Sequence, residues 1–421
     1  MSPTDGLRRI SFWLLLAFVF TIPLEDTVTF GLGRISRVVG LVAFAVWALT
    51  VAARGRVKPR VPAMSAAALL VAWATASYFW SPDRGATLSK VSTLIQMVGV
   101  LWLIWDQVED RTRAVAVMRI FVLASAVAAL VTVFDAQQAA GVGRRFSVTD
   151  VGENNTGCLL AVSVGVAWHL FTLQRGRRWA WLSAAVIPLL AWGALLSASR
   201  TALLALGLGL ILVVVDPRNL MGRRLVLIVL GAGIAVVLVA QLPQGVLTRL
   251  GTTGSELTSG TLNARTTYWR IAFDVFSDHP VGGVGAGAFK EQSAEISVAD
   301  AADGTAAGDF EGKLAHNMFI SVTAELGVVG IALLLTMLAL ALFELRKAPP
   351  EARRTWVVVC TMWFVGANSL TWEVRKITWV VVGLTLVQQA LSAAPPPTPP
   401  RQCRRGPRLA MDVVDARSAA P

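Results

Sequence analysis

The sequence has few charged residues, and this scarcity restricts the class of protein. Only 15% of its 421 residues are Asp, Glu, Lys or Arg, whereas 55% are hydrophobic. Soluble domains carry about 25% charged residues, so the composition excludes an ordinary soluble globular protein. We therefore expect a polytopic membrane protein in which the bundle of membrane spans is itself the main domain.

Cysteine is also scarce, and its three positions have no regular spacing. Cys158 and Cys360 fall in apolar stretches, and Cys403 falls near the C-terminus. Such positions exclude a disulfide framework and a zinc site. The acidic residues between 291 and 311 lack the spacing of a calcium-binding loop. The sequence predicts no metal site and no other cofactor.

Acidic residues are fewer than basic residues, 26 against 38, and the formal net charge is +12. An excess of this size can indicate a nucleic-acid partner. Here the basic residues gather in short loops beside apolar runs, where arginine and lysine set the orientation of membrane spans. We predict contact with membrane lipids and no nucleic-acid partner.

The apolar runs predict an all-α fold, a polytopic membrane helix bundle of about 12 transmembrane helices, since each span needs about 20 apolar residues. No small-residue cleavage site follows Arg8 and Arg9, so the first run is expected to remain as a span. The bundle covers residues 1–392, and the expected spans lie at 10–24, 35–53, 62–80, 90–106, 114–134, 155–173, 179–197, 201–215, 223–241, 317–343, 355–371 and 377–392.

The distribution of basic residues predicts the orientation of the bundle. With the N-terminus inside, the inner segments carry 23 basic residues and the outer segments carry 14. This bias favours both termini in the cytoplasm. The Pro-rich and then basic stretch 393–421 is predicted to be a disordered cytoplasmic tail. The long polar segment 242–315 becomes a partly helical periplasmic loop.

Part of this loop is patterned as an amphipathic helix. Between Asn263 and Ser277, an apolar stripe with helical spacing contains Trp269, Ala272, Phe273 and Phe276. Asn263 is a suitable helix cap. We expect a short periplasmic helix here.

A glycine-rich segment, 282–287, follows that helix. It loosely matches a dinucleotide-binding turn, but the required strand and helix are missing, so a tight backbone turn is the preferred interpretation. The acidic stretch that follows is expected to be a solvated flap.

His316 is the leading candidate for chemistry. It stands where the polar loop meets an apolar helix, and histidine titrates near neutral pH, which suits a general base. Asn317 beside it can orient a hydroxyl. The alternative for both residues is a structural one, in which they hydrogen-bond the start of the helix.

Arginines on the same outer side provide a candidate anion site. Arg200 lies at the start of an apolar run, and a guanidinium binds phosphate oxygens in a planar fork. Its alternative role is an anchor at the membrane surface. Arg265 and Trp269 share one face of the predicted loop helix, whereas Arg270 is five residues from Arg265 and fits a solvated face as well. The cluster indicates chemistry on an anionic, lipid-borne substrate.

Glu325 is an ionisable residue inside an apolar span. Ionisable groups at such depth are candidates for function. It is nine residues beyond His316, so it is expected to point elsewhere, and a structural hydrogen-bonding role is its default interpretation.

Three motifs, in this order, resemble the O-antigen ligase and polysaccharide polymerase superfamily. Ser197-Ala198-Ser199-Arg200 is similar to its S-x-S-R helix start. Asn263-Ala264-Arg265 with Trp269, followed by His279-Pro280-Val281-Gly282-Gly283, is similar to its loop segment. His316-Asn317-Met318-Phe319 with Glu325-Leu326-Gly327 is similar to its H-N helix. The resemblance covers residues 195–335, the expected ligase- or polymerase-like core region.

This resemblance implies a metal-independent, inverting glycosyltransferase. The donor would be a glycan on undecaprenyl pyrophosphate, and the acceptor a sugar hydroxyl at the outer face of the inner membrane. By the resemblance, Arg200 and Arg265 bind the pyrophosphate and His316 is catalytic. Asn317, Arg270, Trp269 and Glu325 are supporting candidates.

Two alternatives remain open at this stage. The acceptor is lipid A–core in an O-antigen ligase, but another lipid-linked repeat unit in a polysaccharide or O-antigen polymerase. A lipid-linked glycan transporter or flippase is the alternative from another class. Transporters place ionisable groups near the membrane midplane on broken helices. Here these groups crowd the ends of spans, with Glu325 as the main exception, which favours chemistry at the surface.

Overall fold

The computed structural model describes residues 3–25, 29–30, 33–138, 146, 152–174, 178–216, 265–302 and 314–392. Four features predicted from the sequence lie outside these residues or largely so: the span at 223–241, the beginning of the long loop up to 264 with its cap Asn263, the last part of the acidic flap, and the tail 393–421.

The described chain is helical except for a short antiparallel strand pair, β1 (Thr29–Phe30) and β2 (Gly33–Arg34). The N-terminal helices are α1 (Pro3–Thr21), α2 (Ile35–Arg54), α3 (Pro62–Ala76), α4 (Arg84–Gln107), α5 (Arg111–Gln138), α6 (Glu153–Leu173), α7 (Arg178–Leu196) and α8 (Arg200–Val215). The C-terminal helices are α12 (Arg265–Asp278), α13 (Phe289–Ala302), α14 (Met318–Glu344), α15 (Pro350–Ala367) and α16 (Lys376–Val387). Five short 3-10 helices connect them: η1 (Ile22–Leu24), η2 (Ser77–Phe79), η5 (Leu345–Lys347), η6 (Trp372–Val374) and η7 (Gln388–Ser392).

Eight described helices, α1 to α7 and α14, are long and apolar enough to cross a membrane. They coincide with eight of the expected spans, and α8 is a shorter apolar helix. The prediction of an all-α, multi-pass membrane bundle is confirmed. The expected span at 377–392 is α16 followed by η7, and every residue of α16 is buried. α16 therefore lies inside the bundle, packed against α4, α14 and α15.

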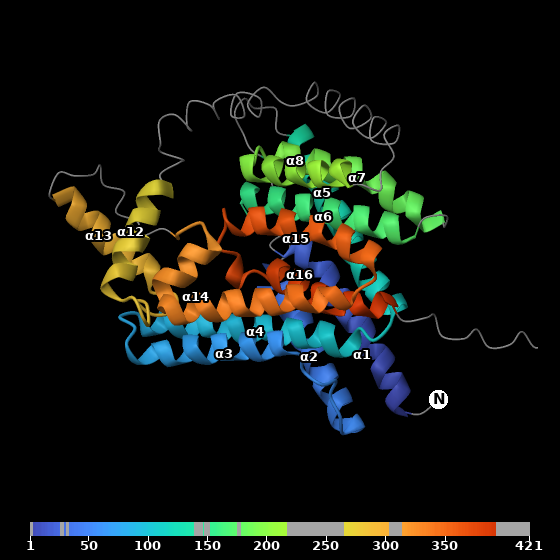
Figure 1. Ribbon diagram of the computed structural model, residues 1–421, viewed down its shortest axis with the longest axis horizontal. Helices are drawn as coiled ribbons and strands as arrows, with labels where there is room; N and C mark the ends of the chain where they lie inside the picture. The colour runs from blue at the N-terminus through green and yellow to red at the C-terminus, as the bar shows by residue number, and fades with distance from the viewer. Residues whose placement is uncertain are drawn as a thin grey trace, which may run out of the picture.

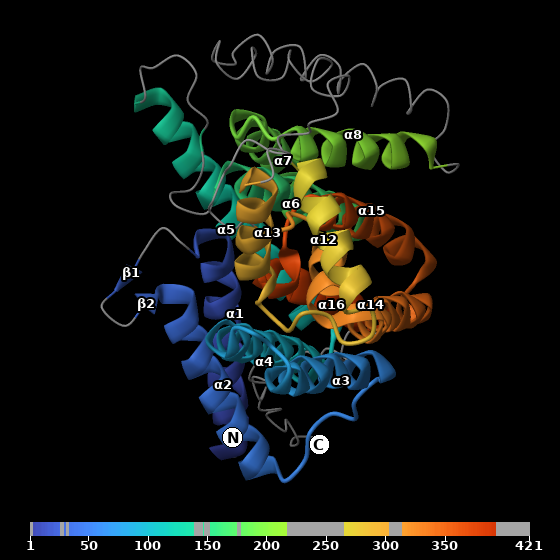
Figure 2. The same cartoon turned by 90° about the vertical axis from the view of Figure 1, so that its left-hand side faces the viewer.

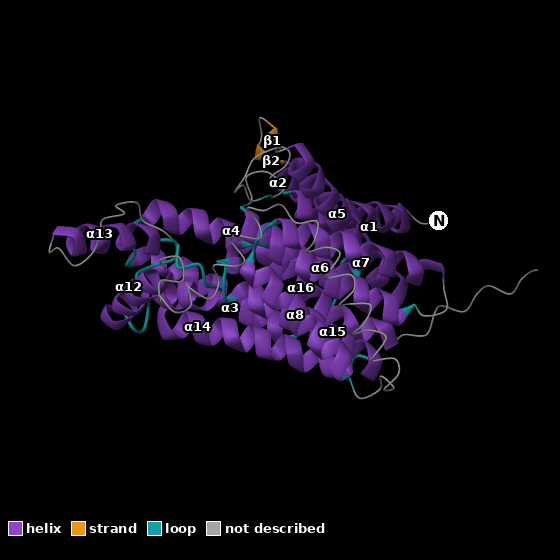
Figure 3. Ribbon diagram, turned by 90° about the horizontal axis from the view of Figure 1, so that it is seen from above, coloured by secondary structure: helices purple, strands orange, loops and turns teal. Residues whose placement is uncertain are grey.

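The helices run side by side, and α12 and α13 lie beyond one end of the bundle (Figure 1). Figure 2 looks onto that end, where α12 and α13 stand in front of α14, α15 and α16. The view from above again places both helices at that end (Figure 3). We call it the site end, and we call the opposite end, where α1 begins, the N-terminal end. The 24 residues of α4 correspond to about 36 Å between the two ends.

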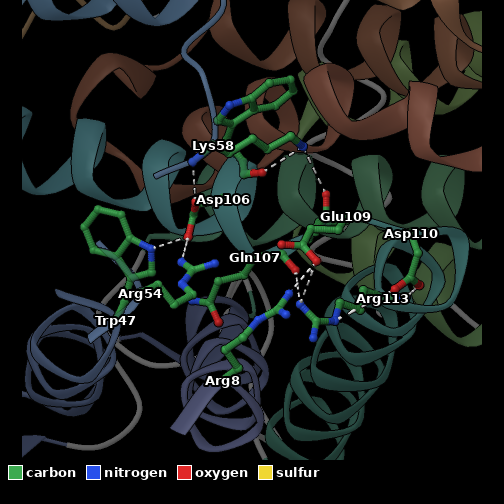
Figure 4. Close-up of polar contacts among 11 residues, drawn as sticks. Arg8, Trp47, Arg54, Lys58, Asp106, Gln107, Glu109, Asp110 and Arg113 are labelled. Atoms are coloured by element: carbon green, nitrogen blue, oxygen red, sulfur yellow. Dashed lines mark hydrogen bonds and ion pairs between the residues drawn. The ribbon is translucent and has the colours of Figure 1, made fainter. Parts of the chain in front are cut away.

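A buried carboxylate joins neighbouring helices at the N-terminal end (Figure 4). Asp106, near the end of α4, accepts hydrogen bonds from Trp47 Nε1 (2.8 Å), Arg54 Nη2 (2.7 Å) and the Lys58 amide (2.8 Å). Arg8 of α1 pairs with Glu109 at 2.5 Å. A buried charge is tolerated when its lone pairs are satisfied in this way. The cluster joins α1, α2 and α4 and fixes their relative positions far from the site end.

The loop helix forms nearly where the sequence predicts it, and its buried face overlaps the predicted apolar stripe at Ala272. Its buried residues are Tyr268, Ile271, Ala272 and Val275, and this face packs toward α13 and α14. Most of the predicted stripe lies beside that face, with Phe273 65% exposed. The acidic stretch begins as helix α13, through Ala302, and its remainder lies outside the described residues.

Candidate functional site

Arg265, the first residue of α12, contacts residues that are distant in the sequence. Arg265 Nη1 donates to Ser369 Oγ at 2.5 Å, and Ser369 Oγ lies 2.7 Å from Thr201 Oγ1. Ser369 follows the end of α15, and Thr201 follows Arg200 in the first turn of α8. A single serine hydroxyl therefore joins the α12 arginine to the helix that begins with Arg200.

Arg200 is the first residue of α8 and is half-buried. The chain reverses just before it, with Ala198 at φ 49°. Ser199 then caps the helix, because its Oγ accepts from the Ala202 amide at 3.3 Å. This local geometry fixes the start of α8 and hence the position from which the Arg200 side chain leaves the backbone.

The start of α14 is built in the same way. His316 has φ 48°, and Asn317 caps the helix by accepting from the amides of Phe319 (2.9 Å) and Ile320 (3.2 Å). A positive φ is uncommon for a residue other than glycine and is found disproportionately at functional sites. His316 is half-buried at this turn.

Two further hydrogen bonds hold this turn against the arginine site. Trp269 Nε1 of α12 donates to Ala315 O at 3.0 Å, and Asn317 Nδ2 donates to Asn368 O at 2.9 Å. The flanking residues of His316 are thus tied to α12 on one side and to the residue before Ser369 on the other. The structure brings Arg200, Arg265, Trp269, His316 and Asn317 to the site end.

The setting of Arg265 strengthens its interaction with anions. Its side chain is partly buried, and this burial lowers the pKa of its guanidinium. Arginine still remains charged in proteins at neutral pH. A cation in surroundings of low dielectric attracts an anion more strongly than the same cation in water.

Two of the supporting candidates lie outside this group. Arg270 is exposed on α12. Glu325 is 2% exposed and belongs to a separate charged network: Lys90 Nζ lies 2.6 Å from Glu325 Oε2 and 2.9 Å from Glu373 Oε1. Ser321 Oγ also donates to Glu373 Oε1, at 2.8 Å. The expectation that Glu325 has hydrogen-bonding partners agrees with this geometry.

α14 is interrupted at Gly327, and the glycine-rich segment fills the interruption. Gly327 has φ 65° and ψ −163°. The Val284 and Gly285 amides donate to the carbonyls of Ala324 (3.0 Å) and Glu325 (2.9 Å), while the Val328 amide donates to Pro280 O at 2.8 Å. The tight turn predicted at 282–287 is therefore an insertion into a broken helix.

Several residues that complete these contacts were not identified from the sequence. Thr201, Asn368 and Ser369 are small polar residues at helix ends, and nothing local distinguishes them from ordinary caps. Lys90 and Glu373 had a usable signal, because charged residues close to or within apolar spans are candidates for function.

Metal ligands do not cluster in the described part of the chain: no group of three or more His, Cys, Asp or Glu side chains there is arranged to hold an ion. His169, within α6, is buried and hydrogen-bonded to Thr355 and Gln388, away from the site end.

Comparison with known families assigns the segment that contains this site. Residues 185–335 match the family model described as O-antigen ligase. This segment is similar to the O-antigen ligase family. The matched segment includes Arg200, Arg265, His316 and Glu325, and it overlaps the core region expected at 195–335. No curated protein matches the chain. This similarity supports, in general terms, a membrane glycosyltransferase of the O-antigen ligase or polymerase type, and it suggests lipid-linked glycans as substrates.

Proposed function

We propose that this protein is a metal-independent, inverting glycosyltransferase of the O-antigen ligase branch. It moves a glycan from undecaprenyl pyrophosphate to a sugar hydroxyl of lipid A–core, at the outer face of the inner membrane. The observation that carries the proposal is the set of hydrogen bonds through Ser369, Asn317 and Trp269. These bonds collect two arginines and a histidine at one end of the bundle.

The two arginines suit the diphosphate of the donor. Guanidinium groups form charge-assisted, bidentate hydrogen bonds to phosphate oxygens. Arg200 lies at the start of α8, a second source of positive potential for an anion. Negative charge grows on the diphosphate as it leaves, and fixed cations stabilise it there. In this proposal, Arg200 and Arg265 do what a metal ion does in other phosphate chemistry.

A neighbouring groove suits the lipid carrier. It has a volume of about 540 Å³ and lies between α12, α14 and α15. Its apolar lining includes Phe273, Phe276, Phe319, Ile331, Leu335 and Phe364. Asn317 and Asn368, whose side chain and carbonyl meet at the histidine turn, line the same groove. A polyisoprenoid chain in the groove would bring its diphosphate to the arginines.

The proposed reaction is a single displacement. His316 accepts the proton of the acceptor hydroxyl, and that oxygen attacks the anomeric carbon of the donor glycan. The bond from the anomeric carbon to the diphosphate oxygen breaks on the opposite face. Its electron pair leaves with undecaprenyl pyrophosphate, so the configuration at the anomeric carbon inverts.

Reconstituted protein tests the assignment. With lipid-linked glycan and lipid A–core in nanodiscs, Arg200→Ala, Arg265→Ala and His316→Ala should each lower transfer by about 100-fold or more, as expected for loss of a preorganised transition-state contact. Arg354→Ala, exposed on α15 away from Asn368, is the control and should retain full activity. Activity should persist in excess chelator. Full activity of His316→Ala, or a strict need for added Mg²⁺ or Mn²⁺, would contradict the mechanism.

The same assay decides between ligase and polymerase. When the protein is given donor with either lipid A–core or additional donor, the ligase glycosylates lipid A–core. A polymerase instead lengthens the lipid-linked glycan.

A flippase is the competing class, and the break in α14 resembles the broken helices of transporters. Here the glycine segment fills the break, and its backbone groups satisfy those of α14. This favours a fixed wall over a translocation path. Movement of labelled donor lipid across liposomes without formation of a glycosidic bond would support the flippase.

A further inference from the structure

A second cavity lies at the site end and is distinct from the arginine and histidine cluster. Its volume is about 620 Å³, within the usual range for small-molecule sites of about 300–1,000 Å³. Its wall includes Lys90, Glu325 and Glu373, but not Arg200, Arg265 or His316. Leu314 and Thr371, each two residues from a member of the first site, also line it. The two sites are therefore neighbours.

The charges on the cavity wall are mixed and nearly balanced. The cations are Arg37, Lys90, Arg375 and Lys376, and the anions are Glu25, Glu325 and Glu373. Lys90 lies between two carboxylates, and Lys376 pairs with Glu25. A wall with this balance attracts neither a polyanion nor a metal cation strongly. It does present donors and acceptors side by side, which is what a polyhydroxylated ligand requires.

One acceptor on this wall has no partner among the described residues. Glu373 is 3% exposed, and its Oε1 accepts hydrogen bonds from Ser321 Oγ and Lys90 Nζ. Its Oε2 is buried and has no hydrogen bond to any described residue. A buried carboxylate oxygen left in this state is unfavourable. Glu373 lines the cavity, and a hydroxyl group there would satisfy this oxygen once a small side-chain movement presents it.

We propose that this cavity binds the acceptor sugar, with Glu373 and Lys90 as its hydroxyl-binding residues. This inference rests on the proposed function, because the acceptor must meet the donor beside His316. Glu373 Oε2 accepts a hydrogen bond from one sugar hydroxyl. Lys90, held by Glu325 and Glu373, donates to a sugar oxygen. The Gly287 amide donates to Glu325 Oε2 at 2.7 Å, so the glycine segment fixes this wall of the cavity.

Two variants test the cavity by different physical means. Glu373→Gln keeps the shape of the side chain but removes its charge. Ser89→Trp leaves the charges intact and fills the cavity from the exposed side of α4. Each should raise the KM for lipid A–core by about 10–100-fold, as for loss of a charge-assisted hydrogen bond. The KM for donor should stay within about twofold of the wild-type value.

The matched control is Glu344→Gln. Glu344 is also a buried glutamate paired with a lysine, Lys347, at 2.6 Å, but it lies at the end of α14 away from the site. It should leave both KM values unchanged. If Glu373→Gln and Ser89→Trp raise the donor KM, or lower kcat alone with an unchanged acceptor KM, the cavity is not the acceptor site.

A binding measurement separates this inference from the proposed function. Lipid-free core oligosaccharide, titrated by calorimetry into protein in nanodiscs, should bind wild type and Glu344→Gln but not Ser89→Trp. Equal binding to Ser89→Trp overturns the cavity assignment even if transfer is observed. Absence of any glycosidic product from wild type overturns the enzyme, and selective binding of the oligosaccharide would then still support the cavity as a sugar site.

Discussion

At the scale of single residues, two glycines make the broken helix possible. A Cβ on Gly327 would lie 2.2 Å from Val281 O, and one on Gly283 would lie 2.2 Å from the Glu325 carbonyl carbon. Both residues have φ near +65°, which other residues rarely adopt. Here the backbones of α14 and the glycine segment touch, and no side chain fits between them.

Substitution of Gly327 therefore has a predictable cost. Gly327→Ala should lower the free energy of unfolding by about 1–3 kcal/mol or more, since it adds strain at positive φ to a backbone clash. Thermal unfolding in detergent measures the loss. Gly207→Ala in α8 is the control, because no atom of the described residues lies within 4 Å of its Cβ position, and it should be neutral or slightly stabilising. Equal stability of the two variants would mean that the segment does not dock as described.

The sequence predicted the structural role of these glycines only in part. A run of glycines predicts a tight turn from local conformational preference alone. That the turn occupies a break in a helix about 40 residues further along the chain is a long-range property. Local preference carries no information about it. The same reasoning applies to Ser369 and Asn368, whose partners Arg265 and Asn317 lie more than 50 residues away.

At the scale of elements, α8 and α14 begin in the same way. In each, a residue at positive φ precedes a capping side chain, Ala198 before Ser199 and His316 before Asn317. The cap satisfies amides that the helix leaves free. It also fixes the angle at which the candidate functional residue leaves the helix, so stability and function are coupled at these two starts.

Asn317 allows that coupling to be tested. Asn317→Ala should destabilise the protein by about 1 kcal/mol through loss of the cap, and it should lower transfer because the His316 turn loosens. Asn317→Asp should restore only the cap, since its carboxylate still accepts from the α14 amides but can no longer donate to Asn368 O. It should nevertheless raise the donor KM, because a negative charge then faces the diphosphate. Thermal unfolding and steady-state kinetics give the two readouts. A fully active Asn317→Ala protein would argue against a positioning role.

Hydrophobicity predicted the elements themselves well. Each span is specified by about 20 consecutive residues, which is local information, and eight long apolar helices were located in this way. The buried face of α12 was predicted less well. The pattern indicated a stripe through Trp269 and Ala272, but it did not identify Tyr268, Ile271 and Val275, which are buried. Which of two apolar faces is covered depends on its neighbours, α13 and α14.

At the scale of the whole molecule, the two ends of the bundle differ in chemistry. The N-terminal end is fastened by Asp106 and its partners, whereas the site end gathers Arg200, Arg265, His316 and the charged cavity. The basic-residue bias predicts that the N-terminal end faces the cytoplasm. If so, the arginine and histidine cluster meets the periplasm.

Cysteine labelling tests this orientation. In a background with Cys158, Cys360 and Cys403 replaced by serine, Leu314→Cys at the site end should react with a membrane-impermeant maleimide in cells with a permeabilised outer membrane. Leu314 is 44% exposed. Arg56→Cys, also exposed but at the N-terminal end, should react only after lysis. The reverse pattern would place the site in the cytoplasm and exclude the proposed donor chemistry.

The segment that fills the break in α14 limits the routes by which a substrate can reach the site. Withdrawing Pro280–Gly287 would leave the buried Ala324 and Glu325 carbonyls without their partners, at about 1–3 kcal/mol for each group. Thermal motion will rarely supply that much energy at once. This side of the protein therefore behaves as a rigid partition, and a sugar chain has to reach the reactive centre by a path that leaves the partition closed.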